Sequence, residues 1–208
     1  MKMRVFSLFL IAASAALVGC GGDPPTAELN AAKQALDAAR SAGAERFASS
    51  EYSAAQSAFS QAEGTVKSES ENLFKNFEQA ASQIADAKSK ADRAKASANS
   101  EKSRQKGAAD GVIASAQAAI LGARTSLNAA PAGKGNEADI EQLRADLSGA
   151  DADLSAARSA VGSENFADAE TEAKNAEQKA GEVANGVQMA TQKYSDLVEK
   201  MRPWYDRI

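Results

Sequence analysis

Apolar residues recur three and four positions apart along most of the chain, which is the spacing of helices with one buried face. The pattern is most regular in the second half, where a turn at Gly162 to Glu164 separates two ladders. The first ladder comprises Ile140, Leu143, Leu147, Ala150, Leu154, Ala157 and Val161, and the second comprises Phe166, Ala169, Ala173, Ala176, Ala180, Val183, Val187, Ala190, Tyr194, Leu197 and Met201. This alternation is that of the a and d positions of a coiled coil. The short turn predicts two antiparallel neighbouring helices.

The second ladder is longer than the first and so predicts an overhang. At ~1.5 Å per residue the last helix spans on the order of 55 Å, which exceeds the length of its partner. The distal half of this helix therefore needs another surface, either the first helical hairpin or a second molecule. We expect Val183, Val187, Tyr194 and Leu197 to form a candidate interaction surface for self-association or for a protein partner.

The amino-terminal half predicts a helical hairpin. One helix runs from Thr26 to about Ala42 and is ended by Gly43, since glycine readily adopts the left-handed conformation that ends helices. The next helix begins at Ser49 or Ser50, either of which can cap it. A polar patch at 67–72 then interrupts the apolar spacing.

Two further apolar runs precede the clearest loop of the chain. The first comprises Leu73, Phe77, Ala80, Ile84, Ala87, Ala91, Ala94 and Ala98, and the second comprises Ala109, Ile113, Ala116, Ile120, Ala123 and Leu127. The second run is shifted in register, so we expect a bend or break near Gly107 and Gly111, with a continuous helix as the alternative. Pro131 and two glycines within 130–136 predict a loop.

The composition supports an all-α fold. Alanine is the commonest residue and aromatic residues make up only 5% of the chain. Alanine has the highest helix propensity, and its small side chain lets helix axes approach closely. We therefore predict an all-α fold of elongated antiparallel helical hairpins, a coiled-coil-like bundle with Ala-rich seams.

The chain lacks the residues on which most enzyme and metal chemistry depends. It contains no histidine and one cysteine, which removes the commonest general base and metal ligand. The acidic residues lie between the ladder positions, where a solvated helix face is expected. A net charge of −4 does not favour binding of nucleic acid. We predict neither an enzyme nor a cofactor or metal site.

The first residues have the layout of a secretory signal. Met1 to Arg4 carries positive charge, the run from Val5 to Leu17 is almost entirely apolar or small, and glycines follow. The apolar run is too short to span a bilayer, which needs about 20 residues. One interpretation is an ordinary secretory signal peptide, for which Ala13 to Ala16 offers a small-residue cleavage site.

The tetrapeptide Leu17-Val18-Gly19-Cys20 resembles the lipobox of bacterial lipoproteins. This resemblance implies that Cys20 is diacylated, that the signal is cut just before it, and that the new amino terminus is acylated. A free thiol and an intermolecular disulfide are the other roles open to a lone cysteine in a secreted protein. Several acyl chains hold a protein stably on a membrane, whereas one does so only marginally.

These patterns together predict the organisation of the chain. The predicted parts are a lipoprotein signal peptide at 1–19, a lipidated tether at 20–25, an N-terminal helical hairpin region at 26–128, a loop at 129–136, a C-terminal antiparallel coiled-coil hairpin at 137–202 and a short C-terminal tail at 203–208. Gly21 replaces the aspartate that retains lipoproteins in the inner membrane of enteric bacteria. By resemblance to that sorting rule, we expect the outer membrane, with the protein facing the periplasm.

The mature amino terminus also resembles a known family. Ala27-Glu28-Leu29, the stretch Ala39 to Ala44, and the Glu51-Tyr52 pair carry the similarity to Ala-rich lipoproteins of Gram-negative envelopes, catalogued as a domain of unknown function. Ser49 stands where that pattern has proline. The resemblance implies an α-helical envelope lipoprotein and carries no established activity. A helix, a short turn and a second helix that begins with an aromatic residue also recur along the chain, in an order that loosely resembles tetratricopeptide repeats.

The sequence leaves two functional hypotheses. The first is a non-enzymatic lipoprotein that acts as a membrane-tethered structural or protein-interaction module. The alternative is a binding module for an anionic envelope polymer or lipid, through the basic stretch 88–106 and above all through Lys88, Lys90, Arg93 and Lys95. Interleaved acidic residues favour a solvated charged face instead. Trp204 and Tyr205 are candidates for a terminal aromatic cap or a membrane-interface contact.

Overall fold

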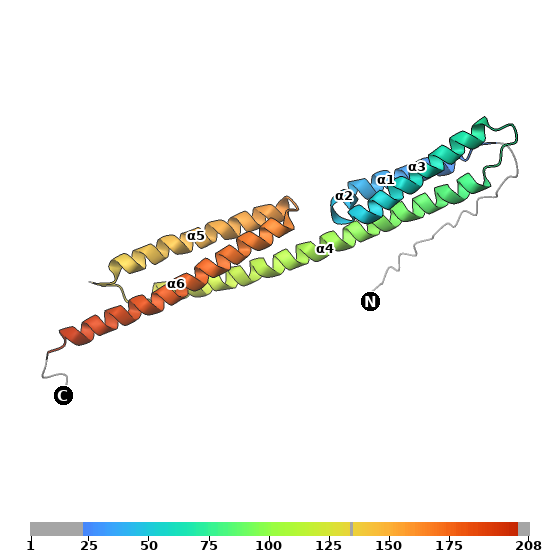
Figure 1. Cartoon of the computed structure of the whole chain (residues 1–208). Helices are drawn as coiled ribbons and strands as arrows, with labels where there is room; N and C mark the ends of the chain where they lie inside the picture. The colour runs from blue at the N-terminus through green and yellow to red at the C-terminus, as the bar shows by residue number, and fades with distance from the viewer. Residues whose placement is uncertain (1–22, 134, 204–208) are drawn as a thin grey trace, which may run out of the picture. The chain divides into compact units, whose positions relative to one another are not determined.

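The computed structural model describes residues 23–133 and 135–203, and its regular secondary structure there is entirely helical (Figure 1). The helices are α1 (Thr26–Ser41), α2 (Ala44–Phe47), α3 (Ser49–Glu71), α4 (Glu78–Ala129), α5 (Glu137–Gly162) and α6 (Phe166–Met201). The predicted all-α class is confirmed. The chain divides into two compact units, 1–96 and 97–208, and the division falls within α4.

Unit 1 consists of α1, α2, α3 and the first part of α4. Gly43 has a φ of +83° and ends α1, as its position in the sequence predicts. The one-turn helix α2 follows at once and was not predicted. One part of the core comprises Ala32, Ala62, Val66, Ala80 and Ile84, with Leu29, Phe59 and Phe77 packed against it. Alanine at most of the buried positions lets α1, α3 and α4 pack closely.

The connection between α3 and α4 differs from the prediction, which placed Leu73 and Phe77 at the start of a helix. The chain is not helical from Asn72 to Phe77, and Leu73 is 90% exposed. The side-chain oxygen of Asn76 accepts a hydrogen bond from the backbone N–H of Glu78 at 3.0 Å. Asparagine competes for backbone hydrogen bonds in this way near helix starts, so α4 begins only at Glu78.

Unit 2 is a three-helix bundle formed by the rest of α4 with α5 and α6. Its core comprises Ala116, Ile120, Ala123, Leu127, Ile140, Leu147, Ala150, Leu154, Ala157, Ala173, Ala176, Ala180, Val183, Val187 and Ala190. Ion pairs join Asp139 to Lys193 and Asp153 to Lys179, both at 2.7 Å, across α5 and α6. Residue numbers rise on one helix as they fall on the other, so the two predicted ladders are antiparallel.

The helix does not break near Gly107, because α4 continues without interruption from Glu78 to Ala129. A glycine inside a helix costs about 1 kcal/mol relative to alanine, which is a modest penalty. Ending the helix would leave backbone groups unsatisfied at two new termini. Buried Ala109 and Ala116 keep this part of α4 packed, so the continuous alternative is the correct one.

Candidate functional site

The predicted interaction surface on α6 is largely covered within unit 2. Val183 is 1% exposed and Val187 is 5% exposed, and both lie in the core shared by α4, α5 and α6. The second part of α4 supplies the surface that the overhanging ladder required. These two valines therefore offer nothing to a partner, and the expectation that they form an open surface is corrected.

Tyr194 and Leu197 are half-buried against the loop between α4 and α5. A Cβ at Gly133 would lie 2.8 Å from Cε2 of Tyr194, and a Cβ at Gly135 would lie 3.0 Å from Cδ2 of Leu197. These distances leave little room for any side chain at either glycine. The two α6 residues therefore cover the loop, and the loop needs glycine at these positions to fit beneath them.

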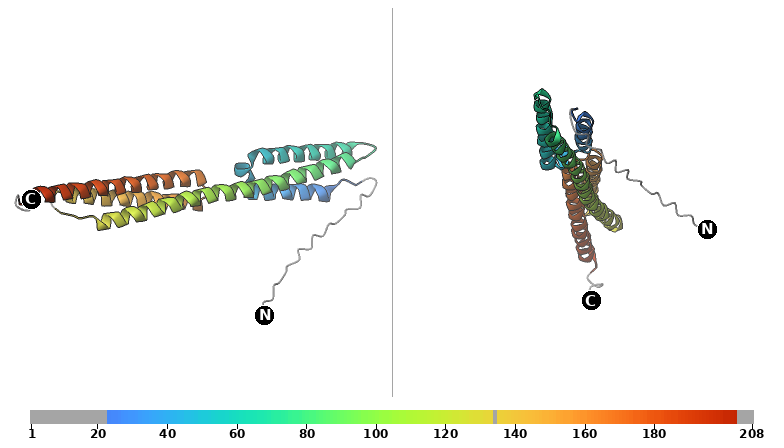
Figure 2. Two further views of the ribbon diagram at one scale, coloured as in Figure 1. Left: turned by 90° about the horizontal axis from the view of Figure 1, so that it is seen from below. Right: turned by 90° about the vertical axis from the view of Figure 1, so that its right-hand side faces the viewer.

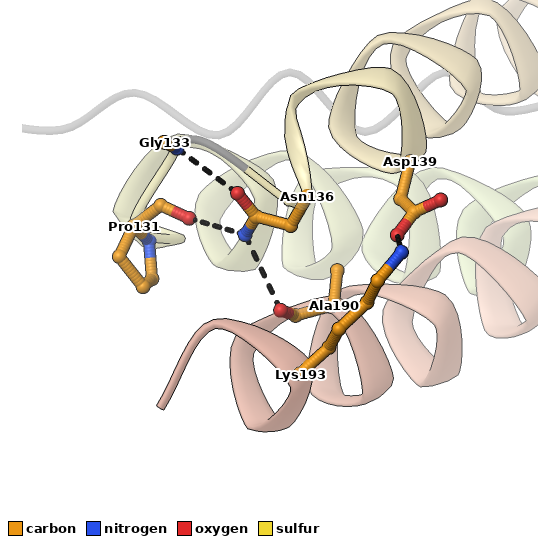
Figure 3. A network of polar contacts seen from close by, with 6 residues as sticks. All are labelled: Pro131, Gly133, Asn136, Asp139, Ala190 and Lys193. Atoms are coloured by element: carbon orange, nitrogen blue, oxygen red, sulfur yellow. Dashed lines mark hydrogen bonds and ion pairs between the residues drawn. The ribbon is translucent and has the colours of Figure 1, made fainter. Parts of the chain in front are cut away.

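Asn136 joins this loop to α6 through hydrogen bonds (Figure 3). The sequence pattern predicted only a loop residue at this position. It is 1% exposed. Its amide nitrogen donates to the carbonyl oxygens of Pro131 at 2.7 Å and of Ala190 at 3.2 Å. Its side-chain oxygen accepts from the backbone N–H of Gly133 at 3.0 Å. A buried amide needs such partners, so Asn136 fixes the loop against one position of α6.

A shallow groove between α5 and α6 lies beside this contact. Its volume is about 330 Å³, and its lining comprises Asp139, Gln142, Leu143, Gly186, Met189, Ala190 and Lys193. Gly186 lies directly beneath the Leu143 side chain, where a Cβ would overlap it. Met189 is 69% exposed, and Val198 and Met201 further along α6 are also exposed. These three are the large apolar side chains of α6 that are exposed to solvent.

The basic residues predicted to contact an anion lie on α4, and most are paired with carboxylates. In unit 1, Lys88 pairs with Asp92 and Lys90 pairs with Asp86, both at 2.7 Å. Arg93 donates to the hydroxyl oxygen of Ser89 at 3.0 Å. Lys95 is exposed. This part of α4 is thus a surface of closely alternating charges, and exposed pairs of this kind exchange readily with solvent.

The basic residues of α4 in unit 2 have acidic partners as well. Lys102 pairs with Glu164, and Lys106 pairs with Asp110 at 2.6 Å. Arg104 donates two hydrogen bonds to the carboxylate of Glu101, at 2.8 and 2.6 Å. The bonds from Arg104 and then from Gln105 lower the pKa of Glu101 to about 2. The predicted anion-contact residues are therefore not a cluster of unopposed positive charge.

Residues 27–109 match the family model described as Domain of unknown function (DUF4398). We call this part of the chain, which is similar to that family, the DUF4398 segment. The match confirms the predicted resemblance of the amino-terminal part to a family catalogued as a domain of unknown function. Comparison with the curated proteins gave no match. Comparison with the solved structures likewise gave none.

The DUF4398 segment includes α2, α3 and all but the first residue of α1, and it extends along α4 into unit 2. The basic residues of the stretch 88–106 lie within it, whereas Asn136 and the groove between α5 and α6 lie outside it. Cys20 lies before the segment and outside the described residues, as do Trp204 and Tyr205 at the other end of the chain.

Within residues 23–133 and 135–203, no three or more histidine, cysteine, aspartate or glutamate side chains come together in a way that could hold a metal ion. None of the helices described there combines the length and the apolar character that crossing a bilayer requires.

Proposed function

We propose that the chain is a lipoprotein of the bacterial cell envelope, tethered through acylated Cys20, whose helical units serve as a structural or protein-interaction module facing the periplasm. The observation that carries the proposal is the Leu17-Val18-Gly19-Cys20 motif at the end of an apolar run. Cys20 precedes Asp23 by three residues, and α1 begins at Thr26. Gly21 after the cysteine favours the outer membrane. Lipid would then hold unit 1 close to a membrane surface.

Mass spectrometry of the mature amino terminus tests the anchor. The expected result is a chain that begins at Cys20 and carries a diacylglyceryl group and an amide-linked acyl chain. The Cys20→Ala variant should leave the membrane fraction, and separation of the two membranes should place the native protein in the outer one. A mature chain that starts elsewhere, or an unmodified Cys20, would overturn the proposal.

The interaction role rests on the apolar side chains that α6 leaves exposed. Met189 and Met201 are 69% and 68% exposed, and Met189 lines the groove between α5 and α6. A photo-crosslinking residue at either position should capture a protein partner or a second copy in intact cells. The same residue at exposed Gln178, also on α6, is the matched control. Equal capture at all three positions, or none at either methionine, would contradict an interaction surface here.

The alternative role, binding of an anionic envelope polymer or lipid along α4, has weaker support. Lys88 and Lys90 already have carboxylate partners at 2.7 Å, so an anion would have to displace Asp92 and Asp86. Replacing Lys88, Lys90 and Arg93 by glutamate separates the two roles. Binding of anionic vesicles or cell-wall fragments that survives these changes would exclude the alternative.

A further inference from the structure

The loop between α3 and α4 presents two adjacent apolar side chains to solvent. Leu73 is 90% exposed and Phe74 is 88% exposed, more than any other exposed large hydrophobic residue in the described part of the chain. Single exposed apolar residues are ordinary on protein surfaces. A leucine and a phenylalanine side by side in one loop, both almost completely exposed, form a small apolar tip.

Polar contacts hold the base of this loop and leave the tip uncovered. One carboxylate oxygen of Glu69 accepts a hydrogen bond from the Asn72 side-chain amide at 3.1 Å and from the Asn76 backbone N–H at 3.4 Å. Asn76 in turn accepts from the backbone N–H of Glu78. These contacts join the residues on both sides of Leu73 and Phe74. The loop therefore has a polar base that is satisfied within unit 1 and an apolar tip that is not packed.

The apolar tip lies at the end of unit 1 where the chain enters α1. Leu29 near the start of α1, Val66 near the end of α3 and Phe77 before α4 pack in one cluster. Figures 1 and 2 show the start of α1 and the α3–α4 loop at the same end of this unit. Cys20 precedes Asp23 by three residues, which extend at most about 11 Å. Acyl chains on Cys20 would thus hold this end of unit 1 beside the bilayer.

The charges around the tip point to an apolar contact with lipid. The ionisable side chains before α1, in its first turn, at the end of α3, in the loop and at the start of α4 are Asp23, Glu28, Lys67, Glu69, Glu71, Lys75 and Glu78. Carboxylates outnumber ammonium groups in this set. Attraction to anionic headgroups therefore cannot drive the contact, and burial of the apolar tip at the interface must do so.

We propose that Leu73 and Phe74 insert into the interface of the bilayer that holds the acylated Cys20, so that unit 1 has two points of contact with the membrane. This proposal rests on the lipid anchor of the proposed function. The anchor raises the effective concentration of the tip at the membrane surface, so that two apolar side chains suffice for stable contact. Two separated contacts also restrict how unit 1 can rotate on the membrane.

The acylated full-length chain in phosphatidylcholine vesicles provides the test. Cys20 is the only cysteine, and its sulfur is blocked once it is acylated, so a new cysteine can be labelled selectively. Lys75→Cys places an environment-sensitive fluorophore beside the intact tip. Ser50→Cys, at the start of α3 and the opposite end of unit 1, is the matched control. Lipids with a spin label in the acyl chain should quench the probe at position 75 several-fold more strongly than the probe at position 50.

Three further measurements distinguish the possible outcomes. Leu73→Ser with Phe74→Ser in the Lys75→Cys background should reduce this quenching to the level of the control. Equal quenching at positions 75 and 50 by vesicle-bound protein would overturn the tip contact while the anchor stands. A position 75 probe shielded from aqueous iodide but not quenched by lipid would assign the tip to a protein contact and also overturn the proposal. Chain that does not float with the vesicles would refute the anchor itself.

Discussion

The loops before and after α4 differ in the side chains that they expose. The loop from Asn72 to Phe77 holds its base with solvent-exposed polar contacts and presents Leu73 and Phe74 to solvent. The loop from 130 to 136 instead buries the polar side chain of Asn136. Tyr194 and Leu197 cover this second loop, whereas Leu73 and Phe74 of the first are almost completely exposed.

This difference indicates a structural role for the loop from 130 to 136, whereas the loop from Asn72 to Phe77 is a candidate contact surface. A covered loop must satisfy every polar group inside it, because an unsatisfied buried donor or acceptor costs about 1 to 3 kcal/mol. An uncovered loop has no such requirement, since water satisfies its polar groups. Its apolar side chains then add little to folding and remain available for a surface outside the chain. The two loops should accordingly respond in opposite ways to substitution.

The largest expected effect is at the buried asparagine. Asn136→Ala removes two donated hydrogen bonds and the acceptor for the Gly133 N–H, so it should lower the free energy of unfolding by about 2 to 3 kcal/mol. Asn72→Ala removes one exposed hydrogen bond to Glu69 and should change it by less than about 0.5 kcal/mol. Denaturant unfolding followed by circular dichroism measures both. Similar losses in the two variants would remove the distinction between the loops.

The next effect tests how closely α5 and α6 pack beside the covered loop. Gly186→Ala would push a Cβ into the Leu143 side chain, which should cost about 1 to 3 kcal/mol. Gly181 lies on the same helix, and a Cβ there meets nothing within 4 Å. Gly181→Ala should therefore stabilise the protein by up to about 1 kcal/mol, because alanine is the better helix former.

Thermal unfolding of the two glycine variants measures this difference, and a third variant assigns its cause. Leu143→Ala in the Gly186→Ala background removes the overlap, so the two changes together should cost less than the sum of their separate effects. Purely additive losses would show that the overlap is not what distinguishes Gly186 from Gly181.

The helices with uninterrupted apolar spacing could be predicted from the sequence. The two ladders predict α5 and α6, and Gly43 predicts the end of α1, because these signals depend on local spacing and on one left-handed residue. Leu73 was misplaced because its spacing to Phe77 and Ala80 is helical. The start of α4 is set instead by the hydrogen bond from the backbone N–H of Glu78 to the side-chain oxygen of Asn76. The sequence signal for this start was an asparagine two residues before the first helical residue.

The candidate site could be predicted less well than the fold. Val183 and Val187 have the spacing of a buried face, and the pattern correctly requires a covering surface for them. It does not say that α4 supplies this surface, because apolar spacing identifies a face and not its partner. Asn136 carried only a weak signal, a polar residue between a glycine-rich loop and a helix. Its burial depends on contact with Ala190, far away in the sequence.

The exposed loop should tolerate substitutions that the covered loop does not. Leu73→Ser with Phe74→Ser should change the free energy of unfolding in the absence of membranes by less than about 0.5 kcal/mol, since both side chains are almost completely exposed. Thermal unfolding of the chain without its lipid measures this. A loss comparable to that of Asn136→Ala would show that the tip packs within the protein, and the contrast between the two loops would fail.

The smallest expected effect concerns an exposed polar contact on α4 itself. Hydrogen bonds from Arg104 and then Gln105 lower the pKa of Glu101 from its ordinary value of 4.5 to about 2. A carboxyl whose pKa is lowered by folding stabilises the folded state above its unfolded pKa, and this contribution is lost as the pH falls from about 4.5 to about 2. The loss should be slight, because the contact is open to solvent.

Titration of the Glu101 carboxyl by NMR checks this directly. Arg104→Ala should raise the pKa of Glu101, although not fully to 4.5, because Gln105 still donates to the carboxylate at 2.7 Å. Lys102→Ala is the matched control, since Lys102 pairs with Glu164 instead. If Arg104→Ala leaves the pKa of Glu101 unchanged, exposed contacts of this kind are weaker than their geometry indicates. The polar base of the α3–α4 loop, which depends on the same kind of contact, would then be held less firmly than its distances suggest.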